Sequence, residues 1–131
     1  MCIDIDRIID YLSSKNEKNV QAEGIELARK IKHLSVLIMP IEDKSTWENC
    51  AKVLISKSDR ELEPYFLSLF EWLQDMNWPG ASLIYDRLLG VNEESLLLSH
   101  KTSLNIAIRT NDAIWKRVLD DFLTDYTETR G

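Results

Sequence analysis

The sequence has few of the residues that carry catalytic or metal chemistry. Its 131 residues include two cysteines, two histidines and four glycines. No CxxC, HxxxH or HExxH spacing occurs, and neither a GxSxG turn nor a glycine-rich phosphate loop is present. Two thiols also do not make a disulfide framework, which favours a reducing compartment. We therefore expect a protein without catalytic residues, bound metal or cofactor.

Long apolar runs and an excess of basic residues are also missing. No run approaches the roughly 18 apolar residues that span a membrane. The first residues include Asp4 and Asp6, which do not resemble a signal peptide, so we expect a cytoplasmic protein. The formal net charge is −6, without the clustered Lys and Arg that bind phosphates. These features argue against a membrane or nucleic-acid partner, and they are compatible with a basic protein partner.

What the sequence does hold is helical periodicity along its whole length. Apolar residues recur at spacings of three and four, and no segment alternates with a period of two. The pattern predicts one all-α domain, residues 1–131, of about seven helices in antiparallel hairpins. The expected helices cover residues 4–13, 20–38, 47–55, 62–73, 81–89, 93–108 and 113–126.

Capping residues suggest where several of these helices begin. Asp43 or Ser45 can cap the third helix, Asn92 the sixth, and Asp112 the seventh. Ser58 and Glu61 have the spacing of a capping box, but Pro64 would then lie inside the helix. We therefore predict a start near residue 62, with Pro64 in the first turn. Pro79 is likewise expected in the first turn of the fifth helix, which Gly90 can close.

Three helices open with an acidic turn residue followed by a tryptophan and an apolar stripe. These tryptophans are Trp47, Trp78 and Trp115, which lie 31 and then 37 residues apart. Each interval holds the rest of one helix, a turn and another helix. Such a period is typical of stacked helical hairpins. The alternative is that tryptophan simply recurs where helix starts pack.

The run Trp72-Leu73-Gln74-Asp75-Met76-Asn77-Trp78-Pro79-Gly80-Ala81 resembles the Trp-Leu-Gln-Asp-x-Asn-Trp-Pro-x-Ala hallmark of a bacterial helical family of unknown function. Residues 25–32 and Trp115-Lys116 are similar to its flanks, so the resemblance spans about residues 25–120. It implies a HEAT-like helical-repeat fold. It also implies a small cytoplasmic partner-binding protein, since some members resemble immunity proteins of contact-dependent toxin systems. The family offers no catalytic residues to carry over.

The remaining candidates for chemistry are better explained by structure. His33 and His100 are expected to be surface or boundary residues, and Cys50 lies on an apolar stripe where a buried thiol is inert. Glu93 and Glu94 fit the start of a helix better than a metal or acid–base pair. The tryptophans could stack on bases, but no basic patch accompanies them, so inter-helix packing is the preferred interpretation of Trp47, Trp72 and Trp78.

The excess of acid lies in two segments. Residues 42–78 hold eight acids and four bases, and residues 112–131 hold five and three. In a helical-repeat stack these carboxylates could converge on one acidic face that steers a basic partner. The predicted partner-binding residues are Glu42, Asp43, Asp75, Asp112, Asp120, Asp121 and Asp125.

The leading hypothesis is a non-enzymatic protein-binding module. Specifically, we expect an immunity protein that occludes a basic secreted toxin domain, such as a nuclease, with its acidic face. The alternative is a scaffold or regulatory adaptor that binds a protein or peptide through an apolar groove between helices. A small hydrolase is a third possibility, for which no nucleophile, base and orienting group can be named.

Overall fold

The computed structural model describes residues 4–40 and 43–131, and within these ranges it contains helices and no strand. The all-α prediction is confirmed. Because α4 and α5 belong to one helical stretch that a 3₁₀ turn interrupts, the described residues form about seven helices. The elements are α1 (Ile5–Tyr11), α2 (Lys18–Ala28), η1 (Leu34–Leu37), η2 (Lys44–Thr46), α3 (Trp47–Leu54), α4 (Asp59–Leu62), η3 (Glu63–Tyr65), α5 (Phe66–Glu71), η4 (Trp72–Gln74), α6 (Ala81–Leu89), α7 (Ser95–Arg109) and α8 (Ala113–Arg130).

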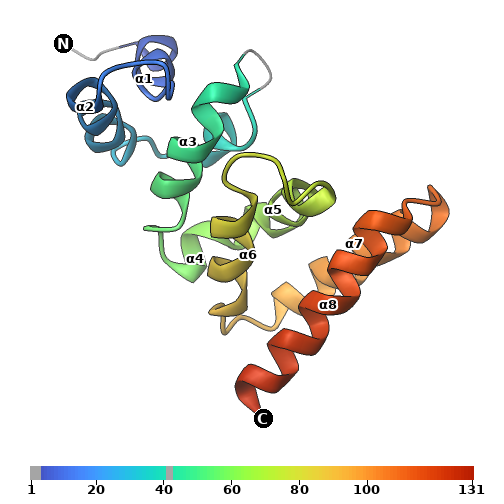
Figure 1. Ribbon diagram of the computed structural model, residues 1–131. Coiled ribbons are helices and arrows are strands. Elements are labelled where there is room, and N and C mark those ends of the chain that lie inside the picture. The colour runs from blue at the N-terminus through green and yellow to red at the C-terminus, as the bar shows by residue number, and fades with distance from the viewer. Residues whose placement is uncertain (1–3, 41–42) are drawn as a thin grey trace.

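The helices follow one another along an elongated body (Figure 1). The α1–α2 hairpin lies at one end, the α7–α8 hairpin lies at the other, and α3, α5 and α6 lie between them. Neighbouring helices pack together along this body, including α2 with α3, α3 with α6, and α5 with α7. HEAT-like stacking stays a prediction. No helix among the described residues is long and apolar enough to cross a membrane.

Tryptophans form the packing centre between α3, η4 and the start of α6. Trp72 is fully buried, and its ring centroid lies 5.9 Å from that of Trp47 in an edge-to-face arrangement. The half-buried Trp78 meets Trp47 in the same way at 5.5 Å. The indole N–H groups are paired, since Trp47 donates to the Pro40 carbonyl at 2.7 Å and Trp72 to the Pro79 carbonyl at 3.0 Å. The prediction that these side chains serve inter-helix packing is confirmed.

Gly80 allows the chain to turn into α6 directly against this centre. Its φ of 84° lies in the left-handed region that favours glycine. A Cβ atom there would lie 2.7 Å from the Cβ of Ala51 and 3.0 Å from the Trp47 carbonyl oxygen. The Gly80 N–H donates to Glu48 at 2.8 Å. Pro79 therefore precedes the helix rather than lying in its first turn as predicted.

A second core joins α5 to the α7–α8 hairpin. Phe70 and Phe122 are fully buried and meet edge-to-face at 5.2 Å. His100 packs against both rings, and its Nε2 lies 2.7 Å from the Leu119 carbonyl oxygen. His100 is only 3 % exposed, so the prediction of a surface or boundary position is wrong for it. It lies on the helical face that also buries Leu96, Ser103 and Ala107, while His33 is exposed as expected.

The second helix ends earlier than the apolar pattern predicts. The second helix was expected to continue to residue 38, but α2 ends at Ala28 and the chain forms the 3₁₀-helix η1. Leu34 and Leu37 are both buried there, and their spacing of three fits a helix of three residues per turn. Apolar spacing alone does not distinguish this arrangement from a longer α-helix.

The capping box at Ser58 is present, contrary to the predicted start near residue 62. The Ser58 hydroxyl accepts from the Glu61 N–H at 3.1 Å, and the Glu61 carboxylate accepts from the Ser58 N–H at 3.1 Å. Pro64 is accommodated because the helix tightens to the 3₁₀ turn η3 at that point. Asn92 does not cap the sixth helix, since α7 begins after Glu94. Asp112 does cap α8, as predicted.

Candidate functional site

Helix α8 and its cap hold four of the predicted partner-binding residues, namely Asp112, Asp120, Asp121 and Asp125. The Asp112 carboxylate accepts from the Trp115 N–H at 3.0 Å and so caps the first turn. Asn111, with φ of 57°, reverses the chain just before it. The buried side of α8 consists of Trp115, Leu119, Phe122 and Tyr126. Because these residues recur at helical spacing, the two flanks of α8 point in different directions, one toward α6 and the other toward the outside of α7.

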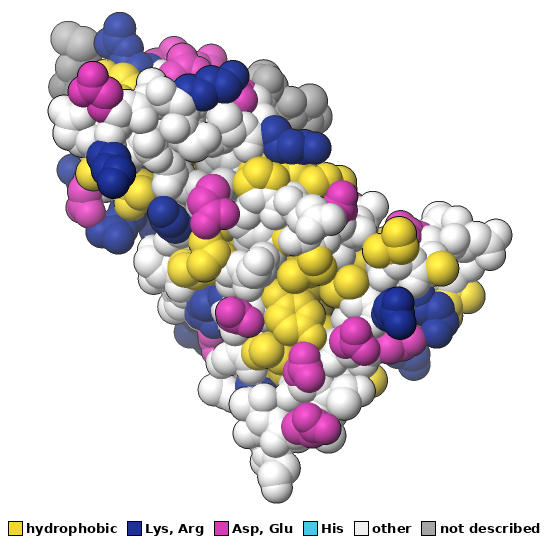
Figure 2. Space-filling view, in the orientation of Figure 1, with side chains coloured by type: hydrophobic (Ala, Val, Ile, Leu, Met, Phe, Trp, Pro, Cys, Tyr) yellow, Lys and Arg dark blue, Asp and Glu magenta, His cyan; other side chains and the backbone are white. Residues whose placement is uncertain are grey.

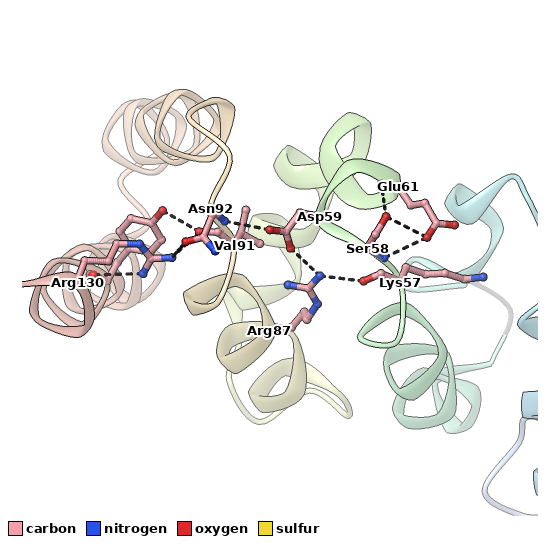
Figure 3. Close-up of polar contacts among 9 residues, drawn as sticks. Lys57, Ser58, Asp59, Glu61, Arg87, Val91, Asn92 and Arg130 are labelled. Carbon is pink, nitrogen blue, oxygen red and sulfur yellow. Dashed lines mark hydrogen bonds and ion pairs between the residues drawn. The ribbon is translucent and has the colours of Figure 1, made fainter.

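The far end of α8 is held by polar contacts to the turn after α6 (Figure 3). The Tyr126 hydroxyl donates to the Val91 carbonyl at 2.8 Å. Arg130 donates to the carbonyls of Leu89 and Val91 at 2.9 and 2.5 Å and to the side-chain oxygen of Asn92 at 3.1 Å. Its guanidinium also lies 3.6 Å from the centroid of the Tyr126 ring. These contacts fix the position of α8 beside α6.

The same network continues to the turn before α4. Asp59 accepts from the Asn92 N–H at 3.0 Å and from Arg87 at 2.7 Å, and Arg87 also donates to the Lys57 carbonyl at 2.8 Å (Figure 3). Desolvation would raise the pKa of Asp59, but the Asn92 N–H and the Arg87 guanidinium outweigh it and lower that pKa. Asp59 therefore acts as a structural carboxylate that links three segments.

Between α6 and α8 lies a surface that combines acids with partly buried apolar groups. We call it the α6–α8 face and define it as Tyr85, Asp86, Val118, Asp121 and Asp125. The Tyr85 hydroxyl donates to Asp125 at 2.5 Å, and its ring meets Phe122 edge-to-face at 5.4 Å. In Figure 2, apolar side chains run along the middle of this side of the molecule over α6, with Asp and Glu side chains on both sides of them.

The electrostatics of the α6–α8 face are those of a hydrogen-bond acceptor surface. Burial, the hydrogen bond to Asp125 and the nearby charges of Asp125, Asp121 and Asp86 together raise the pKa of Tyr85, which stays protonated. Asp121 is exposed and has no hydrogen bond or ion pair with any described residue. The face therefore offers carboxylate oxygens beside an aromatic ring, which suits lysine, arginine or backbone N–H donors.

The structure brings together only part of the predicted partner-binding set. Asp121 and Asp125 lie on the flank of α8 that faces α6, and Asp112 caps the start of that helix. Asp120 is rotated by about 100° from Asp121 because an α-helix has 3.6 residues per turn. It pairs with Lys116 at 2.9 Å on the other flank.

The acids of the first segment are engaged locally. Asp43 accepts from the Ser45 N–H at 2.9 Å, and Asp75 accepts from the Asn77 N–H at 2.8 Å. The side-chain hydrogen bond from Ser45, together with its backbone N–H, lowers the pKa of Asp43. Glu42 lies outside the described residues. Of the six described acids in the predicted set, Asp121 and Asp125 lie together on the α6–α8 face, whereas Asp43, Asp75, Asp112 and Asp120 each pair with a neighbouring group.

Sequence reasoning missed two contributors to the α6–α8 face, Tyr85 and Asp86. Tyr85 is part of the apolar pattern of the predicted helix at residues 81–89, and Asp86 lies in a segment with equal numbers of acids and bases. The signal that could have found them is the position of Tyr85 at the edge of its stripe, where an aromatic residue with a polar tip is often half-exposed.

The candidate nucleophile Cys50 is fully buried in α3. Burial raises the pKa of its thiol to about 12, so it stays a neutral thiol at physiological pH, as the sequence predicted. Among residues 4–40 and 43–131, no group of three or more His, Cys, Asp and Glu side chains is placed to hold a metal ion.

The fold and this surface define a class, a small all-α domain with an acidic and apolar face built on its C-terminal helices. The chain belongs to the family of the domain of unknown function DUF5071, whose model matches residues 42–130. That match includes the tryptophan-rich run at residues 72–81 and the α6–α8 face. Comparison with curated proteins and with solved structures gives no match.

Proposed function

We propose that this protein is a non-enzymatic binding module for a basic protein domain. The observation that carries the proposal is the α6–α8 face, where Asp86, Asp121 and Asp125 surround the half-buried ring of Tyr85. Fixed carboxylates of this kind accelerate the encounter with a positively charged surface, and the apolar centre adds contact area after docking. The carboxylates and the apolar centre are held in position, because hydrogen bonds fix both ends of α8.

The resemblance to immunity proteins supplies the partner class. We propose a secreted bacterial toxin domain, such as a nuclease, whose phosphate-binding site is basic. The carboxylates of the α6–α8 face would occupy that site, and the body of the protein would block access of the substrate. The protein would do no chemistry itself and would act in the cytoplasm of the toxin-exposed cell.

The test begins with the protein encoded next to this one in its genome, since immunity genes lie directly after toxin genes. Both proteins are purified, and their association is followed by stopped-flow fluorescence between about 50 and 500 mM salt. The expected result is a one-to-one complex whose association rate falls as salt rises, because salt screens exposed charges. A rate that does not depend on salt, or a partner with an acidic interface, would overturn the electrostatic mechanism.

Charge-matched variants locate the interface. Asp86→Asn with Asp121→Asn should slow association roughly tenfold at low salt, because both carboxylates lie on the α6–α8 face. Asp121→Asn alone should account for part of this loss, and Asp120→Asn is its matched control, because it removes one charge from the neighbouring residue on the opposite flank of α8. Equal effects of the Asp120 and Asp121 substitutions would show that net charge, and not this face, drives association.

A second candidate function rests on a different observation. On α7, Leu98 is 68 % exposed and Ile108 is 50 % exposed, and Ile108 lines a recess of 400 Å³ together with Ala113 and Lys116. This surface would suit an adaptor that binds an apolar peptide. Leu98→Ser with Ile108→Ser would then abolish partner binding, whereas the double Asp variant would leave it intact.

A further inference from the structure

A pocket opens where η4 faces the tip of the α7–α8 hairpin. In Figure 2 the outline of the molecule is notched between its body and that tip. We call it the Glu71 pocket, and its volume is 690 Å³. It adjoins the α6–α8 face through Ile114, which lies one turn before Val118 on α8. Its lining consists of Glu71, Gln74, Ile106, Thr110, Asn111, Asp112, Ala113, Ile114 and Trp115.

Glu71 is the unusual residue of this pocket. It is half-buried at the end of α5, and its carboxylate has no hydrogen bond or ion pair with any described residue. Burial raises the pKa of Glu71, which means that the charged form is poorly solvated there. A half-buried carboxylate without a partner lowers the stability of the folded chain, and glutamine or leucine at this position would avoid the cost.

The charged side chains that line the pocket are both acidic, and they outweigh the helix end that borders it. The N-terminus of α8 contributes the equivalent of about half a positive charge. Two carboxylates, Glu71 and Asp112, line the same pocket, and the second already caps that helix end. The sum therefore favours a cation over a carboxylate or phosphate ligand.

The remaining lining groups narrow the choice of cation. The amide oxygens of Gln74 and Asn111 can accept further N–H donors, and neither side chain is hydrogen-bonded to a described residue. Ile106 and the 69 % exposed Ile114 provide apolar walls. A guanidinium group on an aliphatic stem matches this set, since it has five N–H donors in a planar fork and is less strongly hydrated than an ammonium group.

We propose that the Glu71 pocket receives an arginine side chain of the protein partner, with Glu71 as the carboxylate that pairs with the guanidinium. This inference rests on the proposed function, because it needs a basic protein that docks on the adjoining α6–α8 face. Under this proposal, Glu71 and the hairpin tip determine which partner binds. The α6–α8 face speeds the encounter and adds contact area.

The probe for the test is N-acetyl-L-arginine amide, titrated into the ¹⁵N-labelled full-length protein and followed by NMR. Saturable shifts are expected at the Trp115 indole N–H and at the backbone N–H groups of residues 111–114. N-acetyl-L-citrulline amide has nearly the same shape without the charge, and it should bind at least fivefold more weakly. The substitution Glu71→Gln should weaken arginine binding at least tenfold and leave the melting temperature equal or higher.

Glu23→Gln serves as the control, since it removes an exposed carboxylate from α2 at the other end of the molecule and should leave binding of the arginine probe unchanged. Equal affinity for the citrulline probe, unchanged binding in Glu71→Gln, or shifts confined to other surfaces would each overturn the inference.

The partner protein separates this inference from the proposed function. If a basic partner binds wild type and Glu71→Gln equally, the pocket proposal fails and the proposed function stands. If the neighbouring gene product does not bind while the arginine probe saturates the pocket, the proposed function fails and the arginine site stands.

Discussion

The two acid-rich segments of the chain use their carboxylates differently. In residues 42–78, Asp43 and Asp75 accept backbone N–H groups at turns, Glu48 accepts from Gly80, and Asp59 pairs with Arg87 and Asn92. In residues 112–131, Asp112 caps α8 and Asp120 pairs with Lys116, but Asp121 has no partner among the described residues and Asp125 is contacted by a tyrosine hydroxyl alone.

The difference shows that the number of acidic residues in a segment does not predict how many of their carboxylates are available to a partner. A carboxylate beside a turn is available to cap backbone N–H groups, and the acid-rich turns of the first segment use it in this way. A carboxylate in the middle of a long helix has no such groups to cap, so it stays available to a partner. Most acids of the first segment therefore stabilise the fold, whereas Glu71 in that segment and Asp121 and Asp125 in the second stay available to a partner.

The largest expected effect is in the first segment, from Gly80→Ala. The new Cβ would lie 2.7 Å from the Ala51 Cβ at a φ of 84°, so backbone strain and overpacking act together. We expect the free energy of unfolding to fall by about 3 kcal/mol in urea denaturation. Gly90→Ala is the matched control, since its nearest contact would be 3.5 Å and its φ is negative. Similar losses for both would contradict the packing argument.

Asp59→Ala should destabilise by about 2 kcal/mol, because the half-buried Arg87 loses its carboxylate and the Asn92 N–H loses its acceptor. The matching change in the second segment, Asp121→Ala, should alter stability by less than about 0.5 kcal/mol. Thermal and urea unfolding of the two variants measure this contrast directly. Equal losses would remove the division between structural and surface carboxylates.

Acid should remove the stability that three carboxylates of the first segment contribute. The backbone N–H and hydroxyl of Ser58 lower the pKa of Glu61, and the pKa values of Asp43 and Asp59 are lowered as well. A depressed folded-state pKa gives stability that is present above the unfolded values, 4.5 for Glu and 3.8 for Asp, and that is lost as pH falls through the folded values. Urea midpoints should therefore decline from about pH 5 to pH 2, less steeply in Asp59→Ala.

The smallest effect has the opposite sign. Glu71 has a raised pKa, so its contribution to stability is most favourable below its unfolded value of 4.5 and declines as pH rises through the interval above it. Glu71→Gln should gain a few tenths of a kcal/mol at pH 7, roughly the cost of a partly solvated unpaired carboxylate. At pH 4 the two proteins should be nearly equal. A loss of stability at pH 7 would mean that Glu71 has a structural partner.

Much of the fold could be predicted because it depends on local pattern. The helical segments, the cap at Asp112, the buried Cys50 and the tryptophan packing all follow from spacing and residue type. The errors occurred where two local arrangements fit the same pattern. Leu34 and Leu37 fit both an α-helix and a 3₁₀-helix, and Ser58 with Pro64 allowed two helix starts.

The candidate site was less predictable than the fold. Asp121 and Asp125 were in the predicted set, but Tyr85, which lies 40 residues from Asp125 in sequence, was not. Glu71 looked like any other exposed acid, because its burial depends on the hairpin tip at residues 110–114 packing opposite it.

By itself the sequence determined the helical content, the apolar stripe of each helix and the residues that can cap a turn, since these depend on neighbours within about one turn. The tertiary structure alone decided which carboxylates are engaged and which are available. It also decided that His100 is buried and that the Glu71 carboxylate has no hydrogen bond or ion pair with any described residue. These properties depend on distances between segments that packing brings together, and a one-dimensional pattern does not contain those distances.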